Sequence, residues 1–306
     1  MWLADARYVS AVVNAGGMAF ITPRSFSDER AYRSELVKCW EYTEGKPFGV
    51  NIYISSRSDA NVALNRMLDI AIQEKVPFVE TAGFSPQAFM MRIKDAGQKV
   101  IHKCTTLRHA QSAVRAGVDA ITIIGAEAGG HPGSDMVGSI VQGGVVPNAV
   151  DVPVVLAGGF GSGRQLLAAL ALGADGILLG SRMTVASEIW AQTSYKKRVV
   201  ESISSDTRIL LSTFQDNLRV LDNETARKVA ALEESQENDF EKYRQFVQGA
   251  NQRDAYQEGD TEKGLLSMGQ SCVFANEIKS VEAIYDEILT EASRYLDNLN
   301  RMVIQR

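Results

Sequence analysis

Residues 152–182 read VPVVLAGGFGSGRQLLAALALGADGILLGSR, and this stretch decides the fold. It holds an apolar run (152–156), a glycine-rich turn, a helical stretch (163–172), a second apolar run (175–179) and a second glycine turn. Both apolar runs are continuous, which is typical of parallel strands covered on both faces. A strand, a helix and another strand in this order indicate an α/β fold with a parallel sheet.

The same alternation extends upstream through most of the chain. Five further strands are expected, at Met18–Ile21, Phe48–Ile54, Pro77–Thr81, Lys99–Cys104 and Asp119–Ile124. Helices are expected around them, near 4–14, 28–42, 59–74, 86–96, 107–116 and 137–148. We therefore expect a (β/α)8 TIM barrel, which needs eight strands. Only seven are found, and the first strand is missing from this sequence, which a misplaced start or a truncated chain would explain.

The strand pattern stops after Met183. The remaining segments are expected to be helical at 187–220, helical at 224–246, loop-like at 248–259 and helical at 280–299. We therefore expect a barrel over 1–187, a smaller helical substrate-side domain over 188–258, and a return to the barrel over 259–306.

Composition narrows the class of protein. The chain has 306 residues, 45% of them hydrophobic, and a net charge of −5 without a basic stripe, so a nucleic-acid partner is not expected. No apolar run is long enough to span a bilayer, and no secretory signal precedes the first helix. Cys39, Cys104 and Cys272 show neither metal nor disulfide spacing, so we expect a cytoplasmic protein without a metal.

The two glycine turns are candidates for binding a phosphate. Gly158 and Gly159 follow one strand, and Gly180 and Ser181 follow the next. Glycines let the backbone approach an anion, and a helix N-terminus adds free N–H groups. Paired turns after the last two strands form the usual phosphate site of a TIM barrel, although two turns without a ligand remain an alternative. A Rossmann fingerprint fails, because Arg164 stands where glycine or alanine is needed.

A histidine lies in another glycine-rich loop, Gly125–Gly133, which follows an apolar strand. Barrel enzymes carry their chemistry at the ends of strands, so His131 is the candidate catalytic acid or base. Gly129 and Gly130 beside it give a backbone able to pack against a flat ring. The alternative is a solvated histidine without a catalytic role.

Two polar residues interrupt apolar strands. Lys103 either faces an anionic or electron-rich cofactor or pairs with a barrel carboxylate such as Glu80. Asn51 either faces a ligand or satisfies backbone groups. His102, in a strand, and His109, in a helix, are expected to be structural.

Together these motifs resemble the nitronate monooxygenase (2-nitropropane dioxygenase) family. The similar segments are Asn14–Met18, Val100–Thr105, Glu127–Gly133, Ala157–Phe160, Gly176–Arg182 and Gly264–Gln270. The resemblance implies an FMN-binding barrel whose phosphate site is Gly158, Gly159, Gly180 and Ser181, with Lys103 and Gly129 along the flavin. We expect Asn51 and Gly130 to bind the cofactor as well. It implies that His131 takes the α-proton of a nitroalkane or orients the nitronate, and that O2, flavin and nitronate give a carbonyl compound and nitrite.

Other activities stay open. The same barrel serves FMN-dependent enoyl-[acyl-carrier-protein] reductases and NAD(P)H:quinone reductases, which share a similar histidine loop. A phosphate-binding barrel without flavin and a non-catalytic remnant are further alternatives. Small-molecule substrates and O2 are the expected partners, and a homodimer is one assembly that the sequence allows.

Overall fold

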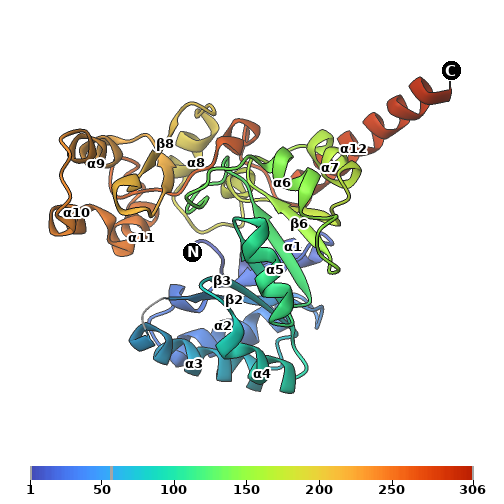
Figure 1. The fold of residues 1–306 in the computed structure, drawn as a ribbon, viewed down its shortest axis with the longest axis horizontal. Helices are drawn as coiled ribbons and strands as arrows, with labels where there is room; N and C mark the ends of the chain where they lie inside the picture. The colour runs from blue at the N-terminus through green and yellow to red at the C-terminus, as the bar shows by residue number, and fades with distance from the viewer. Residues whose placement is uncertain (1, 56–57, 305–306) are drawn as a thin grey trace. The chain divides into compact units, whose positions relative to one another are not determined.

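The computed structural model describes residues 2–55 and 58–304. The chain divides into two compact units. Unit 1 comprises residues 1–123 and 145–155, and unit 2 comprises residues 124–144 and 156–306. Figure 1 labels many of the elements of both units.

Among residues 2–55 and 58–304, the main sheet has seven strands in chain order. They are β1 (Phe20–Ile21), β2 (Gly49–Ile54), β3 (Phe78–Gly83), β4 (Lys99–Cys104), β5 (Ala120–Ile124), β6 (Val154–Ala157) and β7 (Gly176–Leu178). The pairings from β1 to β5 are parallel, and Asn51 of β2 stands opposite Glu80 of β3. The prediction of seven strands in an α/β, TIM-barrel-like fold is confirmed.

Helices alternate with the strands of unit 1, as the sequence predicts. They are α1 (Ala6–Asn14), the short 3₁₀ helix η1 (Pro23–Ser25), α2 (Glu29–Tyr42), α3 (Ser58–Gln73), α4 (Gln87–Asp95) and α5 (Leu107–Arg115). Side-chain caps explain where several begin: Asp5 accepts from the Tyr8 amide, Asp28 from Ala31, and Thr106 from His109. The apolar residues of β2 and β4, such as Val50, Ile52 and Val100, are buried.

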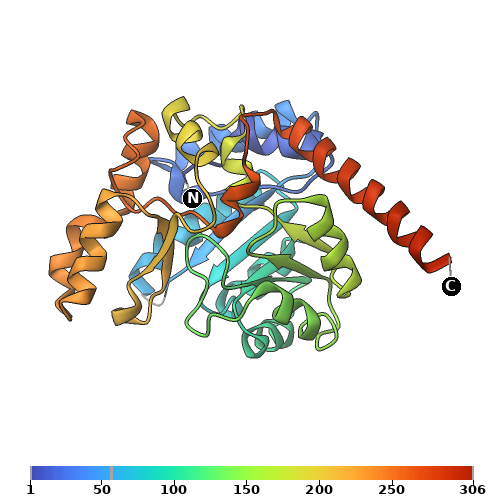
Figure 2. The ribbon, with the colours of Figure 1, turned by 90° about the horizontal axis from the view of Figure 1, so that it is seen from above.

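Unit 2 carries the remaining helices. They are α6 (Ser139–Val145), α7 (Gly163–Ala171), η2 (Ser181–Val185), α8 (Thr193–Val200), η3 (Ser212–Phe214), α9 (Glu224–Glu234), α10 (Phe240–Val247), α11 (Gly249–Glu258), η4 (Gln270–Phe274) and α12 (Val281–Ile304). α7 begins with a capping box between Ser162 and Gln165. α12 packs on α7. Figure 2 shows α12 as one long, continuous helix that leads to the C-terminus.

Two predictions for the region after β7 are wrong. Residues 187–220 are not helical throughout, because they include the antiparallel hairpin of β8 (Thr207–Leu210) and β9 (Leu218–Leu221). Residues 248–259 are not a loop, because they form α11. The polar composition that suggested a loop is that of a largely exposed helix, whose Ala255 and Tyr256 are buried.

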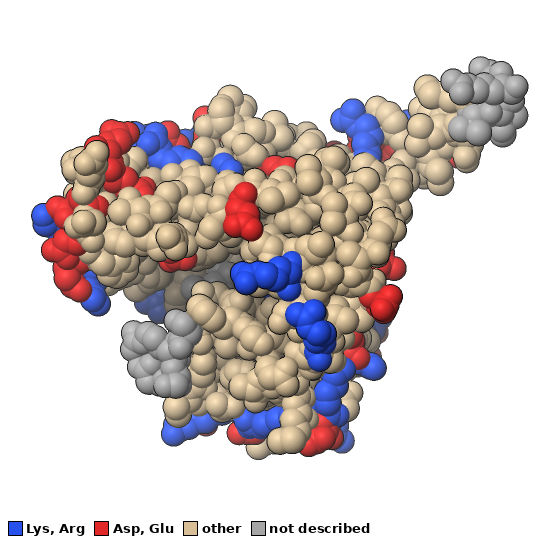
Figure 3. Space-filling view, in the orientation of Figure 1, with Lys and Arg blue, Asp and Glu red and all other residues tan. Residues whose placement is uncertain are grey.

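A separate small core holds the hairpin to the helices after it. Leu210 and Val220 of the hairpin are buried with Val229 of α9 and Tyr243 of α10. Figure 3 shows charged side chains of both signs on the surface of these helices. On α9, Lys228 forms an ion pair with Glu224, one helical turn earlier. In the part of the chain that the structure describes, no helix combines the length and hydrophobicity needed to cross a bilayer.

Candidate functional site

The glycine turn after β6 requires glycine at both positions. Gly158 and Gly159 have φ of +95° and +79°, which favours glycine. A Cβ on Gly158 would lie 2.8 Å from the carbonyl oxygen of Gly125, and one on Gly159 would lie 3.1 Å from Cβ of Glu127. The turn after β6 is therefore packed directly against the start of the histidine loop.

The turn after β7 is open instead. A Cβ on Gly180 would meet no atom within 4 Å. Within residues 2–55 and 58–304, the amides of Gly159, Phe160 and Gly180 donate no hydrogen bond. The hydroxyl of Ser181 accepts a hydrogen bond from the Gly269 amide at 2.8 Å, so its own proton is left to donate. Free amides at two successive turns suit an anion such as the phosphate of FMN.

Ser139 joins the histidine loop to the first turn. Its Oγ lies 2.7 Å from Oε2 of Glu127 in the histidine loop and 2.5 Å from the carbonyl oxygen of Gly158. The Ser139 amide also donates to the Glu127 carboxylate. Glu127 and Ser139 therefore fix the loop that carries His131 against the turn that carries the free amides. Neither residue was a sequence candidate.

The late segment 264–270 joins the histidine loop to the second turn. A Cβ on Gly129 would lie 2.5 Å from the Gly269 nitrogen, and one on Gly269 would lie 2.7 Å from the Gly129 nitrogen. The Gly269 amide in turn donates to Ser181. The close approach of two backbones explains why glycine stands at 129, and unit 2 thereby brings together seven predicted residues: Gly129, Gly130, His131, Gly158, Gly159, Gly180 and Ser181.

The β8–β9 hairpin supports the histidine loop from another side. Arg219 of β9 is buried, and its guanidinium donates to the carbonyl oxygen of Ala126 from Nη2 at 2.9 Å. The side-chain amide of Asn217 donates to the carbonyl oxygen of Gly133 at 3.2 Å. The hairpin therefore contacts both ends of the loop, and sequence reasoning missed it because this segment was taken as helical.

The turn of that hairpin also brings a carboxylate to the histidine. Nε2 of His131 lies 3.5 Å from Oδ1 of Asp216, and both side chains are more than half exposed. The hairpin turn therefore places a carboxylate beside the candidate catalytic histidine at a position open to solvent.

Unit 1 contains the other two predicted residues, Asn51 and Lys103. Both contact Glu80 on β3, which is almost fully buried. Nζ of Lys103 lies 2.9 Å from Oε2 of Glu80, and the side-chain amide of Asn51 donates to the same oxygen at 2.5 Å. The ion pair that was one of the two alternatives for Lys103 is therefore present. Asn51 satisfies a carboxylate, which neither of its alternatives anticipated.

His102, on the other face of β4, has the structural role that was expected. Its Nδ1 lies 2.8 Å from Oγ1 of Thr81, and both side chains are buried. Burial lowers the pKa of His102 to about 4, so the ring is neutral near pH 7.

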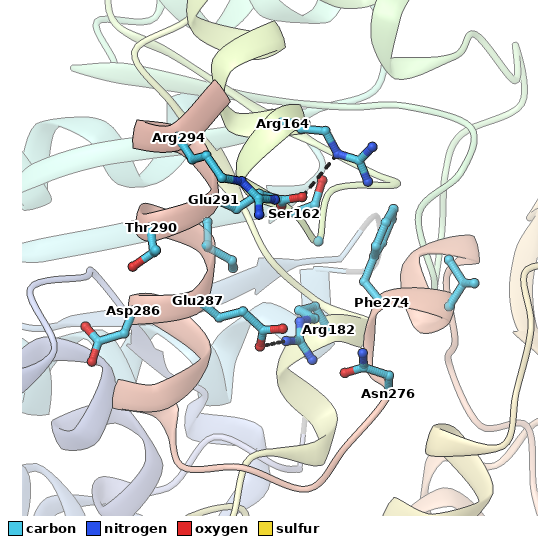
Figure 4. A pocket seen from close by; sticks show the side chains of 13 residues that line it. Ser162, Arg164, Arg182, Phe274, Asn276, Asp286, Glu287, Thr290, Glu291 and Arg294 are labelled. Carbon is cyan, nitrogen blue, oxygen red and sulfur yellow. Dashed lines mark hydrogen bonds and ion pairs between the residues drawn. The ribbon is translucent and has the colours of Figure 1, made fainter. Parts of the chain in front are cut away.

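A separate cavity of about 520 Å³ lies in unit 2. It is lined by the start of α7 and by residues of η2, η4 and α12. Figure 4 shows two ion pairs among its charged side chains: Arg182 donates to Glu287 at 2.7 Å, and Arg164 to Glu291 at 3.1 Å. Asp286 and Arg294 also line the cavity. Burial lowers the pKa of Arg182, and Glu287 opposes this effect. Arg182, which follows the second glycine turn, thus forms an ion pair with α12. The charged residues that line the cavity, Arg164, Arg182, Arg294, Asp286, Glu287 and Glu291, balance in sign, so the lining shows no preference for an anion.

Residues 1–291 match the family model described as nitronate monooxygenase. A 5-hydroxy-7a-methyl-1-oxo-octahydro-1H-indene-4-carboxyl-CoA dehydrogenase of Rhodococcus jostii is 29% identical, covering 98% of this chain and 93% of that protein. A probable nitronate monooxygenase of Staphylococcus saprophyticus is 26% identical, covering 94% and 91%.

Solved structures are similar along nearly the whole chain. FabK from Thermotoga maritima is 31% identical with a TM-score of 0.88, covering 98% of this chain and 93% of that one. A nitroalkane oxidase from Streptomyces ansochromogenes, 21% identical with a TM-score of 0.79 and covering 97% and 94%, shows the same fold. The chain belongs to the nitronate monooxygenase family, and it is a flavin-dependent oxidoreductase.

Proposed function

We propose that this protein is an FMN-dependent nitronate monooxygenase, which converts alkyl nitronates and O2 into carbonyl compounds and nitrite. One observation carries the proposal. Ser139 contacts both Glu127 of the histidine loop and Gly158 of the glycine turn, so the candidate catalytic loop and the candidate phosphate turn are held together. Such an arrangement suits an enzyme that needs its proton-transfer group at a fixed place relative to a phosphorylated cofactor.

In this proposal each residue has a definite task. The amides of Gly158, Gly159, Gly180 and Ser181 bind the FMN phosphate, Gly129 and Gly130 lie along the ring, and Asn51 and Lys103 supply polar contacts to it. His131 takes the α-proton of a neutral nitroalkane or orients the nitronate anion, and Asp216 stabilises the resulting imidazolium. Bound FMN supplies the one-electron chemistry that connects the nitronate to O2.

A second candidate follows from two relatives. The relative named as a CoA dehydrogenase and FabK are 29% and 31% identical to this chain, slightly more than the probable nitronate monooxygenase. Thioesters and nitroalkanes share one property, since both acidify the adjacent carbon. A histidine that exchanges a proton with that carbon would serve NAD(P)H-dependent reduction of an enoyl thioester, or the reverse dehydrogenation, as well as nitronate oxidation. An NAD(P)H:quinone reductase, as the resemblance allowed, would need no such proton.

The other parts of the chain are proposed as support for this reaction. The segment 188–258 contains the hairpin that contacts the histidine loop, and we assign it the substrate side of the enzyme. The cysteines are free thiols, as in proteins of the reducing cytoplasm. A small molecule and O2 are the proposed partners, and the homodimer stays a prediction.

An anaerobic titration separates the candidates. Purified protein loaded with FMN is mixed in turn with a nitronate, NADH and NADPH, and the visible absorbance of the flavin is followed. Loss of the absorbance with nitronate alone supports a nitronate monooxygenase. Rapid loss with a pyridine nucleotide, followed by recovery with an enoyl thioester or a quinone, supports the corresponding reductase. Protein that takes up no FMN contradicts every one of these activities.

A further inference from the structure

Three polar side chains share one face of the sheet in unit 1. Asn51 and Glu80 are opposite each other in the register of β2 and β3. Lys103 lies two residues beyond Ile101, the partner of Glu80 on β4, and side chains two residues apart point to the same face. The three are therefore neighbours by register as well as by contact.

Glu80 lies beneath the other two. Its side chain is 3% exposed, whereas that of Lys103 is 23% exposed. Its Oε2 contacts both Lys103 and Asn51, and its Oε1 is buried with no hydrogen-bond partner among the residues that the structure describes. A buried carboxylate is costly unless it is compensated, so the Lys103 cation is held strongly. A ligand over this face would contact Lys103 and Asn51 while Glu80 stayed covered.

The carboxylate also fixes which groups the other two offer. A carboxylate only accepts hydrogen bonds, so the NH2 of Asn51 must face Glu80, and its carbonyl oxygen is left as an acceptor for a ligand. Lys103 can only donate hydrogen bonds. An ammonium group has three N–H donors, so when one of them is directed at Glu80, two others stay available to a ligand. The pair therefore presents a donor beside an acceptor.

We propose that Glu80 is a positioning residue that prepares Lys103 and Asn51 for the imide edge of the flavin ring, where carbonyl oxygens and N1 accept and N3–H donates. This inference rests on the flavin dependence of the proposed function and adds to it how the ring is selected. Because Glu80 also balances the charge of Lys103, it limits how strongly that ammonium stabilises negative charge on the ring.

The test compares Glu80→Gln with the unchanged protein, both loaded with FMN. The neutral amide in this variant would leave the Lys103 ammonium unbalanced, so the midpoint potential of the flavin should rise. Sulfite, which adds to N5 and places negative charge on the ring, should bind on the order of tenfold more tightly. In a Lys103→Met background the same change of Glu80 should have no effect on either quantity. Glu74→Gln is the matched control, since it removes a carboxylate that pairs with Arg33 outside the sheet and should change neither value.

A second measurement needs no variant. The unchanged apoprotein should bind FMN at least about tenfold more tightly than 3-methyl-FMN, which lacks the N3–H that Asn51 would accept. Three results would overturn the inference while the flavin dependence stood. The first is equal affinity for FMN and 3-methyl-FMN. The second is an unchanged midpoint potential and sulfite affinity in Glu80→Gln, and the third is an effect of Glu80→Gln that persists in the Lys103→Met background. Protein that binds no FMN would overturn both.

Discussion

Arg219 exchanges two main-chain hydrogen bonds with Gly130, the residue before His131. The Arg219 amide donates to the Gly130 carbonyl at 2.7 Å, and the Gly130 amide donates back at 3.0 Å. The Arg219 guanidinium meanwhile reaches the carbonyl oxygen of Ala126, four residues earlier in the loop. A single residue of the inserted hairpin therefore holds the histidine loop at two points, and the hairpin is part of the catalytic apparatus of the proposed enzyme.

Replacing Arg219 by Met should misplace that loop. The change keeps the main-chain bonds but leaves the Ala126 carbonyl without its donor, which should destabilise the protein by about 1–3 kcal/mol. We expect turnover to fall by roughly tenfold or more, because small displacements of a catalytic group are costly. FMN content should stay unchanged, and hydrogen exchange in the loop should increase. Arg208→Met is the control, since Arg208 lies in the same hairpin but pairs with Asp222. Equal losses in the two variants would argue against a role specific to the loop.

His131→Asn should separate proton transfer from the later steps. With a neutral nitroalkane we expect a loss of roughly 10²–10⁴-fold in kcat/KM, the usual contribution of a general base. With the pre-formed nitronate the loss should be smaller, because that anion needs no deprotonation. Steady-state kinetics with both forms of one nitroalkane measures this difference. His109→Asn, on the exposed side of α5, should leave both rates unchanged. Equal losses with the two forms would count against the base role.

The sequence predicted the parallel sheet well because continuous apolar runs leave few alternatives. β4 was predicted with its observed bounds, and each of the other strands was predicted to within two residues at either end. The hairpin was missed because each of its strands has only four residues, Thr207–Leu210 and Leu218–Leu221, without a clear alternation of apolar and polar residues, and because they lie among charged residues that suit helices. For such short segments, local periodicity does not decide between a helix and a strand, because a strand also depends on pairing with a second strand elsewhere in the chain.

The candidate site was predictable only where the backbone itself carries the signal. Glycine spacing marked both turns. In the first turn, a positive φ and close approach require glycine at 158 and 159. Gly180 in the second turn has a negative φ and open space around it, so the fold alone does not require glycine there. Ser139 and Asp216 are ordinary polar residues in the sequence. Ser139 gains its role from its contact with Glu127, and Asp216 gains its role from its contact with His131. His131 and Asp216 are far apart in the chain, so the sequence gives no sign that they meet.

Gly180→Ala should weaken FMN binding without weakening the fold. Gly180 has a negative φ and open space where a Cβ would lie, so alanine is tolerated there. If the phosphate approaches this backbone, the added methyl group should disrupt amide contacts and raise the Kd for FMN on the order of tenfold or more. Gly144→Ala in α6 also points into open space and serves as the control. Flavin fluorescence titration and thermal unfolding give the two quantities. An unchanged Kd in Gly180→Ala would exclude this turn as the phosphate site.

His102 should make the stability of the fold depend on pH. Its pKa is lowered from 6.5 to about 4 by burial, with a smaller contribution from His109. In the unfolded chain the imidazole is protonated below about pH 6.5, whereas in the folded protein it stays neutral until about pH 4. The unfolded state therefore binds more protons in this window, so stability is present above pH 6.5 and is lost as the pH falls towards 4. The difference corresponds to at most about 3 kcal/mol.

His102→Asn isolates this effect from the titration of carboxylates. Asparagine cannot titrate, and its side-chain oxygen can replace Nδ1 as the partner of Thr81. The variant should be less stable than the unchanged protein at neutral pH, because the smaller side chain leaves a cavity in a buried face of the sheet. That deficit should shrink steadily between about pH 6.5 and pH 4, and urea unfolding at intervals across this range measures it. If the deficit is constant with pH, His102 is not held neutral by the fold.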